Sequence, residues 1–162
     1  MVAVSACLLG YPCRYDEKRM IYPELTDLLK SVSVLPVCPE QLAGLDTPRK
    51  PAEILGGDGF DVLNDNASVY DINGNNLTAA LIEGSTEAVN LMLKNEVTSA
   101  ILKENSPSCG INWIHDGSFS GSLARGCGVT TAMLLKHQIK VFADHDINII
   151  SEWLGNGETE QW

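Results

Sequence analysis

The sequence predicts an α/β fold: a Rossmann-like three-layer sandwich with a mostly parallel sheet and a small hairpin insertion. Short apolar runs rich in β-branched residues alternate along the chain with segments whose apolar residues recur at helical spacing. Such alternation favours parallel strands joined by helices that cover both faces of the sheet. With 162 residues, 44% of them hydrophobic, the chain has the size and composition of one globular domain, which we expect to span residues 1–162.

Four short apolar runs are the predicted strands, because each is rich in residues that favour extended backbone. They are Val2–Ala6, Ser31–Val37, Thr98–Leu102 and Lys140–Ala143. Pro36 falls near the end of the second run, where a missing backbone donor does least harm to a sheet.

Four other segments have the spacing of apolar residues that predicts helices. They are Tyr22–Lys30, Thr78 to about Asn95, Val129–His137 and Ile147–Leu154. Thr78 is the predicted N-cap of the second of these helices. The segment Gln41–Gly59, rich in glycine and proline, predicts a long loop, and Asp61–Asp71 predicts a hairpin closed around Asn64–Asn66.

The charge of the chain bears on its partners. Acidic residues number 21 against 11 Lys and Arg, which gives a formal net charge of −10. A chain this acidic repels a polyphosphate backbone, and its basic residues form no dense cluster, so we expect no nucleic-acid partner. No run approaches the roughly 20 apolar residues of a membrane span, and the N-terminus lacks the basic start of a signal peptide. We therefore expect a cytoplasmic protein with no membrane partner.

The placement of the cysteines is the strongest functional signal. The chain has five, an odd number that argues against a disulfide framework and favours free, metal-binding or catalytic thiols. Cys7 and Cys38 directly follow predicted strands, and Cys109 follows a third strand after a short turn. Because the carboxyl ends of parallel strands meet at one edge of a sheet, we expect these three thiols to lie together. No CxxC motif is present, so a zinc ribbon or a thioredoxin-type dithiol lacks its usual signature.

Three interpretations of these thiols are open at this point. Free cysteine is often a small buried hydrophobe, which gives a packing role. Three thiolates also suit a zinc ion completed by water, or an iron–sulfur cluster in which one iron lacks a protein ligand and acts as a Lewis acid. Cys13 and Cys127 follow no predicted strand and are interpreted as structural, although Cys13 is near enough to Cys7 in the sequence to compete as a ligand.

Four blocks of sequence carry a family resemblance. They are ACLLGYPCRYD (Ala6–Asp16), VCPEQLAGLDTPRKPAEI (Val37–Ile54), ILKENSPSCG (Ile101–Gly110) and DGSFSGSLARGCGVTTAMLL (Asp116–Leu135). In this order they resemble the DUF523 family, which includes the thiouracil desulfurases, enzymes that replace the sulfur of a thiolated uracil by oxygen. The blocks run through nearly the whole chain, so the resemblance implies a single DUF523-like domain over residues 1–162.

The resemblance implies a 4Fe-4S cluster held by three cysteines, with one iron left open. Matched motif by motif, the ligands are Cys7, Cys38 and Cys109. The acidic residue of the CPE motif is Glu40 and the first serine of SPSC is Ser106, and both are expected to act in catalysis beside the cluster. Four further polar residues of these blocks are expected to shape the pocket or to hold loops in ion pairs: Arg14, Asp16, Thr47 and Arg49.

The activity implied is the desulfuration of a small thiolated pyrimidine, of the 2- or 4-thiouracil type, by hydrolysis without net electron transfer. In this hypothesis the thiocarbonyl sulfur binds the open iron, water attacks the ring carbon, and Glu40 accepts the proton of the water. Ser106 hydrogen-bonds the water, the sulfur or the developing charge. The sulfur stays on the cluster until it leaves as hydrosulfide. The alternative is a sensor or binding protein that holds an iron–sulfur cluster or zinc and does no catalysis.

Overall fold

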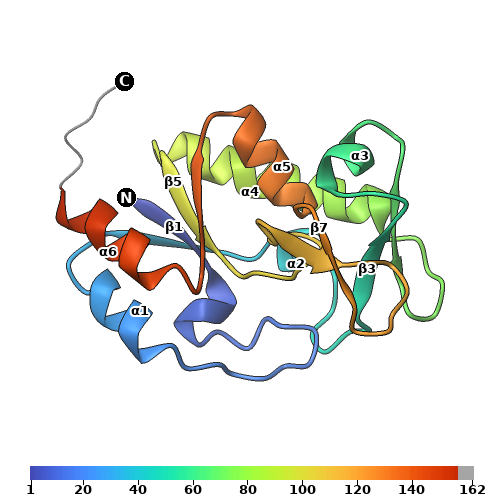
Figure 1. Ribbon diagram of the computed structural model, residues 1–162, viewed down its shortest axis with the longest axis horizontal. Coiled ribbons are helices and arrows are strands. Elements are labelled where there is room, and N and C mark those ends of the chain that lie inside the picture. Colours follow the sequence, from blue (N-terminus) through green and yellow to red (C-terminus); the bar gives the residue numbers. More distant parts are fainter. Residues whose placement is uncertain (157–162) are drawn as a thin grey trace.

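The computed structural model describes residues 1–156, and its centre is a four-stranded parallel sheet (Figure 1). The strands lie in the order β2 (Val34–Val37), β1 (Val2–Ser5), β5 (Ser99–Leu102) and β8 (Lys140–Ala143). The four predicted strands and their parallel arrangement are therefore confirmed. The predicted domain over residues 1–162 includes residues 157–162, which lie outside the described part of the chain.

Helices cover both faces of this sheet, and the predicted three-layer α/β sandwich is confirmed. On one face α1 (Pro23–Leu29) packs beside α6 (Ile147–Gly155). On the other face α4 (Thr78–Lys94) packs beside α5 (Val129–Lys136). The four predicted helices therefore exist, and no bound differs from the expected one by more than one residue.

The packing of β1 explains why the strand segments are continuous apolar runs in the sequence. Successive side chains of a strand point to opposite faces of the sheet. Val4 packs with Leu25 of α1 and Ile150 of α6, whereas its neighbour Ala3 packs with Met92 of α4. Because helices cover both faces, both sets of strand side chains must be apolar.

Two antiparallel hairpins are attached to this core (Figure 1). β3 (Ala52–Leu55) pairs with β4 (Ser68–Asp71), and α3 (Gly59–Leu63) lies between them in the chain. β6 (Trp113–His115) pairs with β7 (Leu123–Arg125). A small hairpin insertion is therefore present, but its strands differ from the predicted ones.

The hairpin predicted within Asp61–Asp71 is wrong, because a helix starts there. The side chain of Asp58 accepts hydrogen bonds from the N–H groups of Phe60 and Asp61, and the Asp61 carboxylate accepts one from the Asp58 N–H. This reciprocal capping box begins α3 where the sequence pattern indicated a strand. The partner of β4 is β3, which lies inside the segment Gln41–Gly59 that was expected to be a loop.

The end of the first strand and the N-cap of α4 also differ from expectation. The first strand ends at Ser5 because Ala6–Leu9 forms a short 3₁₀ helix, η1. Leu77, rather than the predicted Thr78, is the N-cap of α4. The Thr78 hydroxyl is used elsewhere, since it accepts a hydrogen bond from the Val69 N–H at 2.9 Å and so ties α4 to β4.

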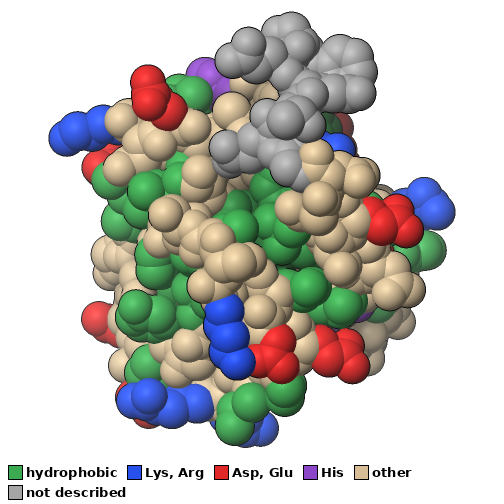
Figure 2. Space-filling view, turned by 90° about the vertical axis from the view of Figure 1, so that its left-hand side faces the viewer, with side chains coloured by type: hydrophobic (Ala, Val, Ile, Leu, Met, Phe, Trp, Pro, Cys, Tyr) green, Lys and Arg blue, Asp and Glu red, His purple; other side chains and the backbone are tan. Residues whose placement is uncertain are grey.

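The distribution of charged side chains on the surface is consistent with the lack of a dense basic cluster in the sequence. Figure 2 shows the side that carries α1 and α6, and on it the Lys and Arg side chains are separated from one another by hydrophobic and acidic ones. Within residues 1–156 there is no helix with the length and apolar character needed to cross a bilayer.

Candidate active site

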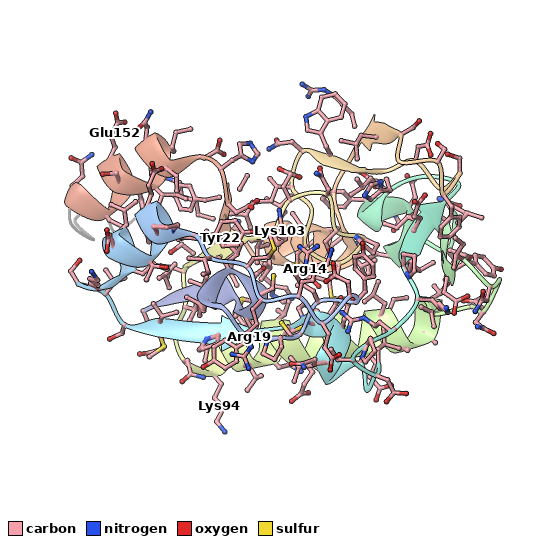
Figure 3. The ribbon with its side chains drawn as sticks, turned by 90° about the horizontal axis from the view of Figure 1, so that it is seen from below. Arg14, Arg19, Tyr22, Lys94, Lys103 and Glu152 are labelled. Atoms are coloured by element: carbon pink, nitrogen blue, oxygen red, sulfur yellow. The ribbon has the colours of Figure 1, made fainter. Side chains whose placement is uncertain are left out.

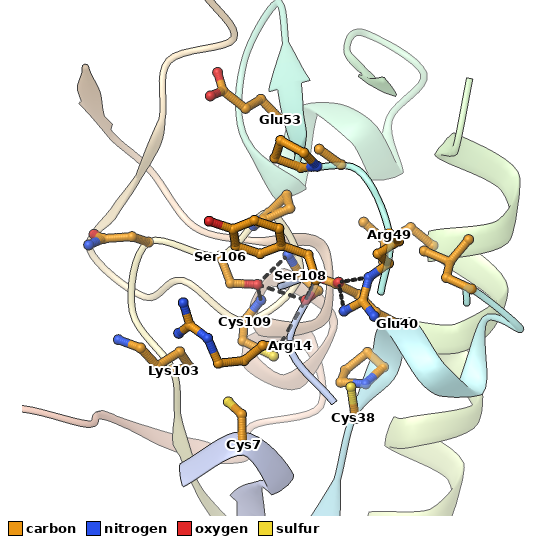
Figure 4. A pocket seen from close by; sticks show the side chains of 18 of the residues that line it. Cys7, Arg14, Cys38, Glu40, Arg49, Glu53, Lys103, Ser106, Ser108 and Cys109 are labelled. Carbon is orange, nitrogen blue, oxygen red and sulfur yellow. Dashed lines mark hydrogen bonds and ion pairs between the residues drawn. The ribbon is translucent and has the colours of Figure 1, made fainter. Parts of the chain in front are cut away.

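Four of the five cysteines line one cavity of about 480 Å³ at the carboxyl edge of the sheet, and three of them are the predicted ligands (Figure 4). Cys7 lies in η1, immediately after β1. Cys38 follows β2 and is the N-cap of the short helix α2 (Pro39–Leu42). Cys109 lies in the turn after β5. The structure thus brings together three thiols that are far apart in the sequence, because their parallel strands end at the same edge.

These thiols surround the cavity and do not converge on a single point. All five cysteines of the chain are free. Within residues 1–156, no three His, Cys, Asp or Glu side chains are close enough to hold one metal ion. An iron–sulfur cluster takes each thiolate on a separate iron, so its ligands stand apart from one another. A donor set of three thiols around one cavity therefore fits a cluster.

A fourth thiol, Cys13, lines the same cavity; the sequence favoured a structural role for it, with competition as a ligand as the alternative. Its side chain is 2% exposed and hydrogen-bonds to the thiols of both Cys7 and Cys38. The Cys38 thiol also lies 4.0 Å from the backbone carbonyl of Cys13. The proximity of Cys13 to Cys7 in the sequence was the signal for this contact. Cys127, by contrast, lies outside the cavity, 4.0 Å from an oxygen of Asp58.

Three thiols of this site, those of Cys13, Cys38 and Cys109, have pKa values raised above the ordinary value of a thiol. The pKa of Cys38 is raised far above the ordinary value of a thiol by a hydrogen bond with Cys13 and by burial. Burial raises the pKa of Cys109 to about 12. The hydrogen bond with Cys38 lowers the pKa of Cys13, but the one with Cys7 and desolvation outweigh it and bring that pKa to about 11. Because metals bind thiolates, loading this site releases protons.

Glu40 lies in the first turn of α2 and faces the same cavity. Both of its carboxylate oxygens are engaged. Oε2 accepts hydrogen bonds from the Arg49 guanidinium, one of them from Nε at 2.8 Å, and Oε1 accepts one from the Ser108 hydroxyl at 3.0 Å. Arg49 also donates to the Cys13 carbonyl at 3.0 Å. Arg49 is thus an ion-pair partner that fixes Glu40 beside the thiols.

Ser106 connects to Glu40 through a residue that sequence reasoning missed. The hydroxyls of Ser106 and Ser108 are 2.8 Å apart, and Ser108 in turn donates to Glu40 (Figure 4). The Ser106 oxygen also accepts hydrogen bonds from the N–H groups of Ser108 and Cys109, at 3.1 and 3.2 Å. The three side chains form a continuous path along which a proton can move. The second hydroxyl of the SPSC motif was the available signal for Ser108.

The turn that carries Ser108 and Cys109 is held by the first turn of α5. The Val129 N–H donates to the Pro107 carbonyl and the Thr130 N–H donates to the Ser108 carbonyl, both at 2.9 Å. The Thr131 hydroxyl donates to the Cys109 carbonyl at 3.0 Å. The orphan N–H groups of the helix start are therefore satisfied by this turn rather than by a capping side chain.

Glu104 fixes the same turn from the other side. It is 6% exposed, and its Oε1 accepts hydrogen bonds from the backbone N–H groups of Ile111, Asn112 and Trp113 at 2.8, 3.0 and 3.1 Å. Burial raises the pKa of Glu104, but these backbone donors outweigh it and leave the pKa below its usual value. A buried, ionised Glu104 therefore orders the chain that follows Cys109.

Arg14 and Lys103 also line the cavity and lie near the centre of the molecule (Figure 3). Arg14 pairs with Asp16 at 3.1 Å, and Lys103 pairs with Asp144 at 2.9 Å. In Figure 3 Lys94 and Glu152, by contrast, point outward. The ion pair expected among Arg14, Asp16, Thr47 and Arg49 is present, and the Thr47 hydroxyl accepts a hydrogen bond from Arg49 at 3.2 Å.

Comparisons with known proteins agree with this architecture. Residues 2–146 match the family model described as 2-thiouracil desulfurase. The chain is 39% identical over 150 residues to the uncharacterized protein YbbK of Bacillus subtilis (strain 168), an alignment that covers 93% of this chain and 99% of that protein. Among solved structures, the 4Fe-4S-dependent thiouracil desulfidase TudS (DUF523Vcz) superposes with a TM-score of 0.82 at 37% identity, covering 96% of this chain and 97% of that chain.

The fold and the site define a class of protein: a three-layer α/β enzyme with thiols, a carboxylate and serine hydroxyls at the carboxyl edge of its sheet. This chain belongs to the 2-thiouracil desulfurase family. The resemblance to DUF523 and the prediction of an enzyme are thereby confirmed.

Proposed function

We propose that this protein is a thiouracil desulfurase that removes sulfur from a small thiolated pyrimidine by hydrolysis. The observation that carries the proposal is the single cavity in which three thiols meet the connected side chains of Glu40, Ser108 and Ser106. A solved relative with the same fold and 37% identity is a 4Fe-4S-dependent thiouracil desulfidase, which supports the same chemistry here.

Cys7, Cys38 and Cys109 are the proposed ligands of a 4Fe-4S cluster. When bound, the cluster supplies a Lewis-acidic iron without a protein ligand, an acceptor for the substrate sulfur. Arg14 is near enough to Cys7 for their charges to interact, so its guanidinium offsets part of the negative charge of a bound thiolate.

Glu40 is the proposed general base. A water molecule that loses its proton toward Ser106, Ser108 and Glu40 becomes a nucleophile for the ring carbon that carries sulfur. Ser108 already donates its hydrogen to Glu40, so Ser106 is positioned to donate to Ser108 and to receive a proton from the water. Arg49 holds the carboxylate in place and stabilises its negative charge.

The reaction balances without an oxidant or reductant. A thiocarbonyl and one water give a carbonyl and hydrogen sulfide, with no change in the number of electrons on the pyrimidine. The sulfur of a 2- or 4-thiouracil leaves as sulfide, so we propose that catalysis is non-redox.

A small pyrimidine is the proposed partner, rather than a nucleic acid. A cavity of about 480 Å³ suits a small molecule. The net charge of −10 disfavours a polyphosphate backbone. The five free thiols support the proposal of a cytoplasmic location, since disulfides persist in oxidising compartments.

Anaerobic reconstitution tests the proposal, with Cys109→Ser compared with Cys127→Ser. Both residues are buried, but only Cys109 lines the cavity. We expect about four irons per wild-type chain, sulfide release from 2- or 4-thiouracil, loss of both in Cys109→Ser and retention of both in Cys127→Ser. A wild-type protein that holds the cluster and releases no sulfide would favour the sensor interpretation, and one that holds no iron would leave the thiols a packing role.

A further inference from the structure

The wall of the cavity across from Cys7 and Cys38 carries a carboxylate that the proposed chemistry does not use (Figure 4). Glu53 lies in β3 and is 6% exposed. His115 ends β6, which contacts β3, and lines the same cavity. A carboxyl and an imidazole side chain thus line a cavity that the thiols and Glu40 also border.

One oxygen of Glu53 is committed to the fold and the other is free for a ligand. Oε2 accepts hydrogen bonds from the N–H groups of Gly117 and Phe119, at 2.8 and 3.1 Å. Oε1 accepts none from the residues that the structure describes. The nearest recorded group to it is His115 Nδ1 at 4.0 Å, which is beyond hydrogen-bond distance.

His115 also has a polar atom that lacks a hydrogen-bond partner within residues 1–156. Its Nδ1 atom is buried and has no hydrogen-bond partner among residues 1–156. Buried polar atoms in folded proteins are nearly always paired, and an exception in a cavity wall points to a ligand or water that completes it. An acceptor and a nitrogen that can donate, 4.0 Å apart in two residues that line one cavity, therefore both lack a hydrogen-bond partner among residues 1–156.

Phe119 is an aromatic residue whose backbone contacts Glu53. It lines the cavity, and its backbone has a φ of 55°, in the left-handed region that non-glycine residues rarely adopt. The hydrogen bond from its N–H to Glu53 holds this conformation. Aromatic side chains stack on the flat faces of nucleobases.

We propose that Glu53 and His115 recognise the polar edge of the pyrimidine ring, an inference that rests on the proposed function. A uracil-type ring carries an N–H beside a C=O. Glu53 Oε1 accepts the ring N–H, His115 donates from Nδ1 to the ring carbonyl, and Phe119 lies against the ring face. This pairing selects rings with an unsubstituted nitrogen at that edge.

Binding of uracil, the sulfur-free product, to the reconstituted protein tests the inference without turnover. Glu53→Gln keeps an oxygen for the backbone N–H groups but removes the carboxylate acceptor, and His115→Phe removes the donor. We expect the Kd for uracil to rise about 10- to 100-fold in each, as for loss of a hydrogen bond to a charged or buried group. Glu87→Gln, on the exposed face of α4, is the matched control and should leave the Kd unchanged.

The ratio of kcat/KM for unmethylated and methylated substrates tests recognition directly, because a purely structural role of Glu53 would not change this ratio. Wild-type kcat/KM should fall about 10- to 100-fold when the recognised ring nitrogen is methylated. Glu53→Ala leaves space for the methyl group and should remove this difference, with iron content and thermal unfolding checking that the variant is folded and loaded. If Glu53→Gln and His115→Phe both bind uracil as the wild type does, the inference is wrong while desulfuration stands. If uracil binding depends on Glu53 but no sulfide is released, recognition stands and the proposed function fails.

Discussion

At the scale of single residues, Glu40 owes its position to two side chains from other parts of the chain. Arg49 holds one oxygen and Ser108 the other, so the carboxylate cannot turn away from the cavity. A base acts only when it is within hydrogen-bond reach of the proton it takes, directly or through a relay. In the proposed mechanism Ser106 and Ser108 extend that reach, so that two connected hydroxyls act where one was expected to act.

Replacing Glu40 with Gln keeps the size of the side chain and removes the base. We expect sulfide release per cluster to fall about 10²- to 10⁴-fold, the usual contribution of general acid–base catalysis. Iron content should stay at the wild-type level, because Glu40 is not a proposed ligand. Assays of sulfide release and of iron content on anaerobically reconstituted protein measure these two quantities, with Glu87→Gln as the exposed control. Wild-type turnover in Glu40→Gln would remove Glu40 from the mechanism.

At the scale of elements, the site depends on how closely α5 approaches the turn that carries Cys109. A side chain at Gly128 would place its Cβ 2.4 Å from the carbonyl carbon of Ser108 and 2.8 Å from the Cys109 nitrogen. Both are backbone atoms that cannot rotate away. Glycine at the N-cap of α5 therefore permits the contact that holds the cysteine turn.

Gly128→Ala should force α5 away from this turn. We expect a loss of about 1–3 kcal/mol in the free energy of unfolding, the range for overpacking a tight contact, together with reduced iron content after reconstitution. Gly155→Ala is the matched control, because a Cβ there meets nothing within 4 Å and the residue lies in α6. Urea unfolding of the two variants gives the comparison, and equal stabilities would show that the turn adjusts freely.

At the scale of the whole molecule, acid stability reflects the buried carboxylate of Glu104. Its pKa is lowered in the folded protein, because backbone N–H groups that stabilise the ionised form outweigh desolvation. The stabilisation is therefore complete above the pKa of an unfolded glutamate, about 4.3. It is lost as the pH falls through the lower, folded pKa.

Glu104→Gln should lower the free energy of unfolding at pH 7 by about 1–3 kcal/mol, because a charged acceptor of several hydrogen bonds is lost. The difference between wild type and variant should shrink as the pH falls below the pKa of an unfolded glutamate, about 4.3, and toward the lower, folded pKa at which the wild-type carboxylate becomes neutral. Urea unfolding at a series of pH values measures both effects. A difference that stays constant down to pH 2 would contradict an ionised Glu104.

The sequence by itself determined the sheet, its helices and the meeting of three cysteines. Val2–Ala6, Ser31–Val37 and Thr98–Leu102 are apolar runs that a doubly covered parallel sheet requires, and residues that follow parallel strands must reach one edge. The family also followed from motifs that can be read along the chain. The roles of Cys7, Cys38 and Cys109 as ligands remain a prediction.

Only the tertiary structure decided what surrounds those cysteines. The contacts of Cys13 with Cys38, and of Arg49 and Ser108 with Glu40, pair residues that no pattern in the sequence pairs. The capping box that begins α3 also changed the partner of β4. Local patterns report which face of an element is buried, whereas hydrogen bonds between loops depend on where the packed core brings those loops.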